Sequence, residues 1–210
     1  MEPDPAGDGR NPGGRDGFEG QTEAALDGLD EDVRLMLAFR EGDGAAFEGL
    51  FRRWAAPLLR YLERVVRDAA TAEELVQEVF LRVHRARDRY APEARFSTWL
   101  YRIATNLALN ELRRPRRRDP HRGLDDEETP SLAAKTPAAD DVVHARRLGE
   151  AALRELGELP ERQRAALWLS AVEGLAYSEV AVALNVSEKA VKALVHRARS
   201  ALAEKLQEGG

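Results

Sequence analysis

The chain has 210 residues, of which 43% are hydrophobic and 33% charged, with no cysteine and a formal net charge of −5. This composition fits one domain or two small ones in a charge-rich helical protein and excludes a wholly disordered chain. The lack of cysteine excludes disulfides, thiolate catalysis and cysteine-bound zinc. No apolar run approaches the roughly 18 residues of a membrane span, and the acidic start MEPDPAGDGR does not resemble a signal peptide. We therefore expect a cytoplasmic protein without membrane insertion.

The net charge hides an alternation along the chain. Residues 1–32 hold ten acidic residues and two arginines, whereas residues 87–122 hold ten arginines and four acidic residues. Residues 124–141 are acidic again, and residues 187–205 are basic. Because a polyanion responds to local charge, the two basic segments are candidate nucleic-acid contacts in spite of the acidic total.

The chain begins with residues 1–29, which are rich in Gly, Pro and Asp and predict a disordered acidic tail. From Asp32 onward the apolar residues recur at helical spacing. Pro57 is expected to kink or break the helix that contains it. The apolar stripe before this proline consists of Phe47, Leu50, Phe51 and Trp54.

Two further helices are predicted in this half of the chain. Thr71 followed by Glu74 is a capping-box pattern, which predicts a helix beginning at Thr71. The stretch FSTWLYRIATNLALNELRR predicts a helix that begins at Ser97 or Thr98 and ends before Pro115. Residues 115–141, with four prolines and clustered charges, indicate a flexible linker.

The remainder, residues 142–207, is helical again and ends in a helix-turn-helix pattern. Pro160 suits a first helical position, Asn185 tolerates the left-handed conformation of a tight turn, and Ser187 is a natural N-cap. The last helix is either a DNA-reading helix or a solvated basic one. The residues left for DNA on its polar side are Lys189, Lys192, His196, Arg197 and Arg199.

Polar side chains also line one face of the helix predicted at 98–113. Asn reads adenine edges and Arg holds phosphates, so this face is a second candidate for nucleic acid. Aromatic residues cluster nearby and suit stacking on single-stranded bases, although Phe96 and Trp99 fit a hydrophobic core equally well. The polar residues are Arg102, Asn106, Asn110 and Arg113, and the aromatic ones are Tyr90, Phe96, Trp99 and Tyr101.

No catalytic constellation is present in the sequence. The acidic face at Glu73, Glu74, Gln77 and Glu78 is more typical of a solvated or protein-binding surface than of paired catalytic carboxylates. The four histidines have no metal-ligand spacing, and no Gly-rich phosphate loop occurs. We therefore expect neither an enzyme nor a cofactor.

Taken together, the stretches LVQEVFLRV, RFSTWLYRIATNLALNELRR, LPERQR and VSEKAVKALVHRARSAL resemble the sigma-70 family of bacterial transcription initiation factors, in particular its small extracytoplasmic-function (ECF) group. The resemblance implies an all-α fold of two small helical domains. Region 2 would span residues 30–114 and region 4, with the helix-turn-helix, residues 142–207. The implied partners are core RNA polymerase, through its β′ coiled coil and β flap, promoter DNA and an anti-sigma factor.

The resemblance also assigns roles to residues. The face that grips the polymerase β′ coiled coil would be Glu74, Gln77, Glu78 and Arg82. The residues that capture the −10 element as a single strand would be Tyr90, Arg95, Phe96, Ser97, Thr98, Trp99, Arg102, Asn106, Asn110 and Arg113. The residues that read the −35 element would be Ser187, Lys189, Lys192, His196, Arg197 and Arg199.

Several positions depart from the family pattern. Arg102 and Ile103 stand where housekeeping members carry an aromatic pair, which predicts weaker promoter melting. Ala190, Ala193 and Leu194 replace residues able to hydrogen-bond DNA, so the −35 contacts are expected to differ from the usual ones. Ala176 replaces a capping Ser, which predicts a looser helix start. Two alternatives stay open: a stand-alone helix-turn-helix regulator, and a sigma-like adaptor that binds polymerase without reading DNA.

Overall fold

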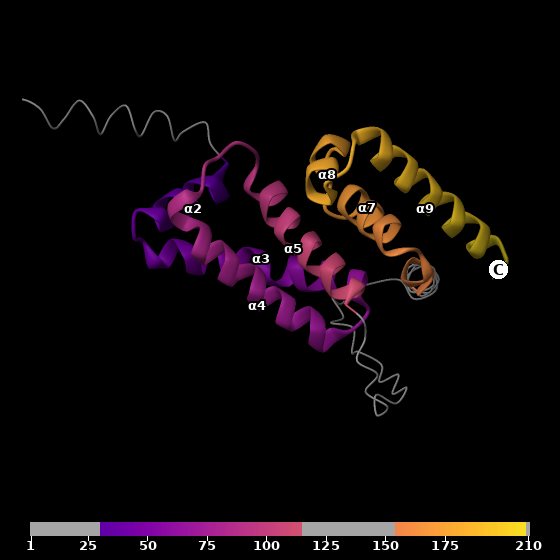
Figure 1. Ribbon diagram of the computed structural model, residues 1–210, viewed down its shortest axis with the longest axis horizontal. Coiled ribbons are helices and arrows are strands. Elements are labelled where there is room, and N and C mark those ends of the chain that lie inside the picture. Colours follow the sequence, from indigo (N-terminus) through magenta and orange to yellow (C-terminus); the bar gives the residue numbers. More distant parts are fainter. Residues whose placement is uncertain (1–29, 115–153, 209–210) are drawn as a thin grey trace, which may run out of the picture.

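The computed structural model describes residues 30–114 and 154–208, and every regular element in these two ranges is helical (Figure 1). The predicted all-α fold with two helical units is therefore confirmed for this part of the chain. The predicted tail 1–29 and linker 115–141 lie outside the described residues. The first unit consists of α2 (Glu31–Arg40), α3 (Gly44–Val66), α4 (Ala69–Ala86), the short 3-10 helix η1 (Arg87–Arg89) and α5 (Phe96–Arg113). The second consists of a helical turn at 154–158, α7 (Glu161–Ala171), α8 (Tyr177–Leu184) and α9 (Glu188–Glu208).

In the first unit, α3 packs against α2, α4 and α5, and the side chains between these helices form a hydrophobic core. Aspartates cap three of its helix starts: Asp30 before α2, Asp43 before α3 and Asp68 before α4. Each accepts a hydrogen bond from a backbone N–H group that the first helical turn leaves without a partner. The fully buried larger side chains include Leu50, Leu58, Tyr61, Leu62, Val79 and Leu100.

The boundaries of these helices differ from prediction in three places. Pro57 lies inside α3, which continues to Val66, because residues on both sides of the proline are buried. That burial outweighs the roughly 3 kcal/mol that an interior proline costs. Asp68 caps α4 in place of Thr71, and it accepts a hydrogen bond from the Thr71 N–H at 2.7 Å. The helix α5 begins at Phe96, slightly before the predicted start at Ser97 or Thr98.

The apolar stripe predicted in α3 is only partly internal. Leu50 is fully buried, and Phe47 and Trp54 are half-buried against the core. Phe51 is 44% exposed, so this member of the stripe lies at the surface. Its ring instead packs on Phe80 of α4, with centroids 4.7 Å apart, at the edge of the core.

A buried hydrogen bond joins α3 to α5. The hydroxyls of Tyr61 and Thr105 are 2.6 Å apart, and both residues are wholly inaccessible to solvent. Burial raises the pKa of the Tyr61 hydroxyl well above its usual range, so it stays neutral and can share the hydrogen bond.

We expect Thr105→Val to lower the free energy of unfolding by about 1–3 kcal/mol, because it leaves the Tyr61 hydroxyl buried without a partner. Replacing both residues, as Tyr61→Phe with Thr105→Val, is expected to cost less than the two single changes added together. Urea denaturation of the four proteins measures this coupling. Strictly additive losses would show that the bond contributes nothing specific.

In the second unit, α7, α8 and α9 surround a smaller core. The tight turn after α8 follows prediction: Asn185 has the left-handed φ of 51°. The predicted Ser187 cap is also confirmed, since its hydroxyl accepts a hydrogen bond from the Ala190 N–H at 3.2 Å. Pro160 differs slightly, because it is the N-cap of α7 rather than its first helical residue.

The two units are in contact with each other. The helix α5 packs against α8, and α3 packs against α7. Figure 1 shows α5 on the side of the first unit that faces α7 and α8, while α4 lies on the opposite side of α5 from the second unit. The part of α4 that points away from α3 and α5 therefore faces solvent.

Candidate functional site

The outward face of α4 carries the acidic residues singled out in the sequence. Glu74 and Gln77 are exposed, and Glu78 is half-buried. The Arg82 guanidinium donates to Glu78 over 2.8 Å, one helical turn away. This hydrogen bond holds the pKa of Glu78 below its usual value, so the carboxylate stays charged at neutral pH. The structure thus brings all four predicted residues onto one accessible surface.

Two apolar side chains near this face were missed as candidates. Leu81 of α4 is 50% exposed. Phe51 is 44% exposed, and its ring lies against that of Phe80, the residue before Leu81 in the sequence. Apolar side chains beside a charged rim are typical of a protein-docking surface rather than of a solvated helix face. Leu81 could have been found from the sequence, because it falls outside the apolar stripe of its helix.

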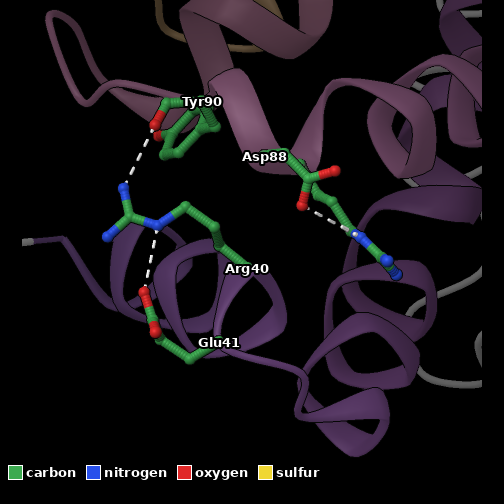
Figure 2. Close-up of polar contacts among 5 residues, drawn as sticks. Arg40, Glu41, Asp88 and Tyr90 are labelled. Atoms are coloured by element: carbon green, nitrogen blue, oxygen red, sulfur yellow. Dashed lines mark hydrogen bonds and ion pairs between the residues drawn. The ribbon is translucent and has the colours of Figure 1, made fainter.

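The segment between α4 and α5 is held by contacts to α2. The Arg40 guanidinium donates to the Tyr90 carbonyl over 3.4 Å and to the Glu41 carboxylate over 3.2 Å (Figure 2). Arg87 lies over the Phe39 ring at 5.6 Å and bonds Asp88. These contacts fix the chain just before the residues assigned to the −10 element.

Aromatic rings pack together at the start of α5. Phe96 is fully buried and contacts the rings of Trp54, Tyr90 and Trp99. In this structure the Phe96 ring belongs to the core and packs against Trp99, whereas its predicted contact with DNA stays a prediction. Tyr90 is also buried, and this burial raises its pKa to about 12. Trp99, half-buried with its ring 5.1 Å from that of Tyr90, is more accessible than the buried Tyr90 and Phe96.

A pocket of about 230 Å³ opens beside these rings. Tyr90 and Trp99 form its aromatic wall, and Arg89 and Arg102 bring positive charge to it. Val182 of α8, in the second unit, also lines it. An aromatic wall with adjacent cations has the chemistry for an unstacked base and its phosphate.

The remaining −10 candidates divide by exposure. Arg95 is exposed and Ser97 is half-buried, whereas Thr98 is only 1% exposed. The polar face predicted on α5 is fully accessible and continuous. It consists of Arg102, Asn106, Asn110 and Arg113.

The helix-turn-helix presents its second helix to solvent. Val191, Val195 and Ala198 of α9 are buried against the unit, and Leu194 is half-buried. Lys192 forms an ion pair with Glu188 over 3.1 Å. All six predicted −35 residues are exposed: Ser187, Lys189, Lys192, His196, Arg197 and Arg199.

The helix start at Ala176 is better held than expected. The Glu179 carboxylate accepts a hydrogen bond from the Ala176 N–H over 2.8 Å. This contact supplies half of a capping box from the third helical position, so α8 does not depend on a side-chain cap at residue 176.

Residues 30–114 and 154–208 hold neither a membrane-spanning helix nor a metal-binding cluster. No helix there is both long and apolar enough to cross a membrane. Likewise, no group of three or more His, Asp or Glu side chains in the same ranges is placed to hold a metal ion.

Comparison with known proteins assigns these two units to a class. Residues 50–118 match the family model for sigma-70 region 2, and residues 149–202 match the model for sigma-70 region 4. The first model covers α4, the aromatic group and the polar face of α5. The second covers the helix-turn-helix through most of α9.

Two curated sigma factors match this chain over nearly their whole length. RNA polymerase sigma factor CarQ of Myxococcus xanthus is 39% identical over 173 residues, which are 82% of this chain and 96% of that protein. The ECF RNA polymerase sigma-E factor of Escherichia coli K12 is 30% identical over 181 residues, which are 84% of this chain and 94% of the relative. The chain belongs to the ECF group of the sigma-70 family, and its function is to direct RNA polymerase to specific promoters at initiation.

Solved structures agree with this fold. CnrH, determined in complex with the cytosolic domain of CnrY, superimposes with a TM-score of 0.63 at 25% identity and covers 86% of this chain and 100% of CnrH. RpoE of Bartonella quintana, in complex with the anti-sigma factor NepR, has a TM-score of 0.60 at 22% identity, covering 77% of this chain and 96% of that one.

Proposed function

We propose that the chain acts as a dissociable subunit that docks on core RNA polymerase through α4 and contributes no catalytic step of its own. The observation that carries this is the accessible α4 surface, where Glu74, Gln77, Glu78 and Arg82 lie beside the exposed Leu81. Nucleotidyl transfer is then the work of the polymerase. The same proposal places the protein in the cytoplasm, where the polymerase acts.

DNA contacts are divided between the two units in this proposal. Trp99 stacks on a base of the opened −10 strand, and the polar face of α5 follows the phosphates and base edges of that strand. The six exposed residues from Ser187 to Arg199 contact the −35 element as duplex. When the polymerase holds both units, binding of one unit to DNA raises the effective concentration of the other at its own element, so the two together bind the promoter more tightly than either alone.

The limits of the two domains are also part of the proposal. Region 2 spans residues 30–114 and region 4 spans residues 142–207, with residues 115–141 as the link between them. Because CnrH and the Bartonella RpoE were each determined with a partner, and NepR is described as an anti-sigma factor, we propose that an anti-sigma factor also binds this chain.

Binding and transcription assays with core polymerase test the proposal and separate it from the alternatives. We expect the chain to co-sediment with core polymerase and to give discrete run-off transcripts from genomic fragments. A stand-alone regulator would bind specific duplex tightly without polymerase. An adaptor would bind polymerase but select no start sites.

The −35 contacts are expected to depend on salt. Lys192→Ala and Arg197→Ala should each weaken binding of the holoenzyme to a selected promoter fragment. Each should also reduce the slope of log affinity against log salt by about 0.9, because one phosphate contact is lost. Arg154→Ala, an exposed arginine in the same unit, is the matched control and should leave the slope unchanged. Equal slopes for all variants would remove these two residues from the interface.

A further inference from the structure

The helix α2 has no part in the roles assigned so far. The matched region 2 begins at residue 50, so α2 (Glu31–Arg40) precedes it. In the structure α2 packs against α3, α5 and η1, the short helix that leads into the −10 residues. A helix placed between the core and this segment can determine where the segment lies.

The segment between α4 and α5 supplies most of the pocket beside Trp99. Arg89 and Tyr90 both line this pocket, and residues 91–95 are exposed and not helical. The backbone hydrogen bonds of the segment are local, such as the one from the Tyr90 N–H to the Arg87 carbonyl over 3.2 Å. Local bonds of this kind do not fix the segment relative to the rest of the unit, so contacts from other helices must do so.

Both ends of α2 reach Tyr90. At the end of the helix, the Arg40 guanidinium donates to the Tyr90 carbonyl over 3.4 Å, and Figure 2 shows the same guanidinium bonded to Glu41. At the start of the helix, the carboxylates of Asp30 and Asp32 add to the effect of burial in raising the pKa of the Tyr90 hydroxyl. Both carboxylates are therefore within electrostatic range of the Tyr90 side chain.

Further contacts join α2 to η1 and to α3. The Arg87 guanidinium lies over the buried Phe39 ring, 5.6 Å from its centroid. Arg53 of α3 donates to the carboxylates of Glu31 and Asp32 over 2.5 and 2.6 Å. Because Asp32 is buried, solvent ions screen this pair less than a fully exposed one. The helix α2 therefore connects α3 to the −10 segment.

We propose that α2 is a positioning element of the −10 site and that Arg40 is its main positioning residue, because it holds the Tyr90 carbonyl and so the wall of the pocket beside Trp99. This inference rests on the proposed strand-binding role of α5 and Trp99. Arg40 touches no part of the DNA itself and acts through Tyr90. Without Arg40 the pocket wall is free to shift, so the opened strand is captured more weakly while docking through α4 is unaffected.

Capture of a single strand by the holoenzyme tests this role. The probe is the single strand of the −10 segment from a selected promoter fragment, with 2-aminopurine, whose fluorescence is quenched by stacking, in place of one adenine. We expect holoenzyme with Arg40→Ala to bind this strand about five-fold to ten-fold more weakly, because one hydrogen bond from a charged group is lost. It should also quench the probe less at saturation. Arg40→Lys keeps a donor for the Tyr90 carbonyl and should recover most of both.

Three controls separate positioning from a loss of charge or of structure. Arg34→Ala removes an exposed arginine from the same helix and should change neither affinity nor quenching. Arg40→Ala should leave the affinity for core polymerase unchanged, and also the slope of log affinity against log salt for the strand. A slope reduced by about 0.7 would show that Arg40 itself holds a phosphate. Weaker binding to core polymerase without recovery by Arg40→Lys would show a general loss of structure, and either result would overturn the proposal.

The inference and the proposed function fail in different ways. Trp99→Ala should lower both affinity and quenching in the same assay. If it does, and Arg40→Ala behaves as the wild type, Trp99 binds the strand without help from α2 and the inference is wrong. If Trp99→Ala also behaves as the wild type, the strand-binding role is itself refuted, and the inference with it.

Discussion

Reversing the charge of both Glu74 and Glu78 to Lys is expected to lower the affinity of the chain for core RNA polymerase by about ten-fold to a hundred-fold. The two carboxylates are the negative part of the α4 surface, and Glu78 is held charged by Arg82. Like charges placed across an interface cost several kcal/mol and slow association, so the loss should be largest at low salt. Competition for polymerase against a labelled wild-type chain measures it.

Two controls locate this effect on α4. Glu204→Lys reverses an exposed acidic residue of α9 and should leave polymerase binding unchanged. Leu81→Ser removes an exposed apolar side chain without changing charge, and it should weaken binding in a way that is insensitive to salt. Equal affinities for the double charge reversal and the wild type would mean that polymerase docks elsewhere.

Trp99→Ala is expected to reduce run-off transcription from duplex promoters by about ten-fold to a hundred-fold. Stacking of a single-stranded base on an aromatic ring contributes about 1–3 kcal/mol, and Trp99 is more accessible than the neighbouring Tyr90 and Phe96 rings. Trp99→Phe keeps a ring in the same place and should retain most of the activity. Urea denaturation of both variants confirms that the loss does not come from unfolding.

Templates whose −10 segment is mismatched, and therefore already open, test whether opening the duplex there limits transcription. The family resemblance of the sequence implies that Arg102 and Ile103 stand where housekeeping members carry an aromatic pair, which predicts fewer rings to trap an opened strand. We therefore expect wild-type holoenzyme to transcribe pre-opened templates more efficiently than the matched duplex. No gain from pre-opening would contradict this explanation.

Local chemistry made the turn of the helix-turn-helix predictable. A left-handed turn residue and an N-cap each favour particular side chains, and Asn185 and Ser187 have those side chains and occupy those positions. The polar face of α5 was predictable for a similar reason, since helical spacing alone places its four residues together.

Burial was harder to predict than helical spacing. Phe51 and Phe96 both follow apolar patterns, yet Phe51 is 44% exposed beside α4 and Phe96 is fully buried. Sequence spacing gives the direction of a side chain around its own helix, but which neighbour covers it depends on tertiary packing. Tertiary packing also explains why α3 continues past Pro57, because burial of its residues in the core outweighs the local cost of the proline.

Contacts between the two units could not be predicted at all. Thr98 and Glu179 are 81 positions apart, and Arg164 and Val65 are 99 apart. No spacing rule connects residues so distant in sequence. The sequence does signal the bond between Glu179 and the Ala176 N–H, because Glu stands at the third helical position of α8, where a capping box places it.

Footprinting on a selected promoter fragment tests most directly whether the two helical units act as a promoter-selecting device only on the polymerase. The account predicts that the reconstituted holoenzyme protects two segments whose centres are about 85 Å apart along the duplex. The chain alone should protect neither at the same concentration. Protection of both segments by the chain alone, or of neither by the holoenzyme, would contradict it.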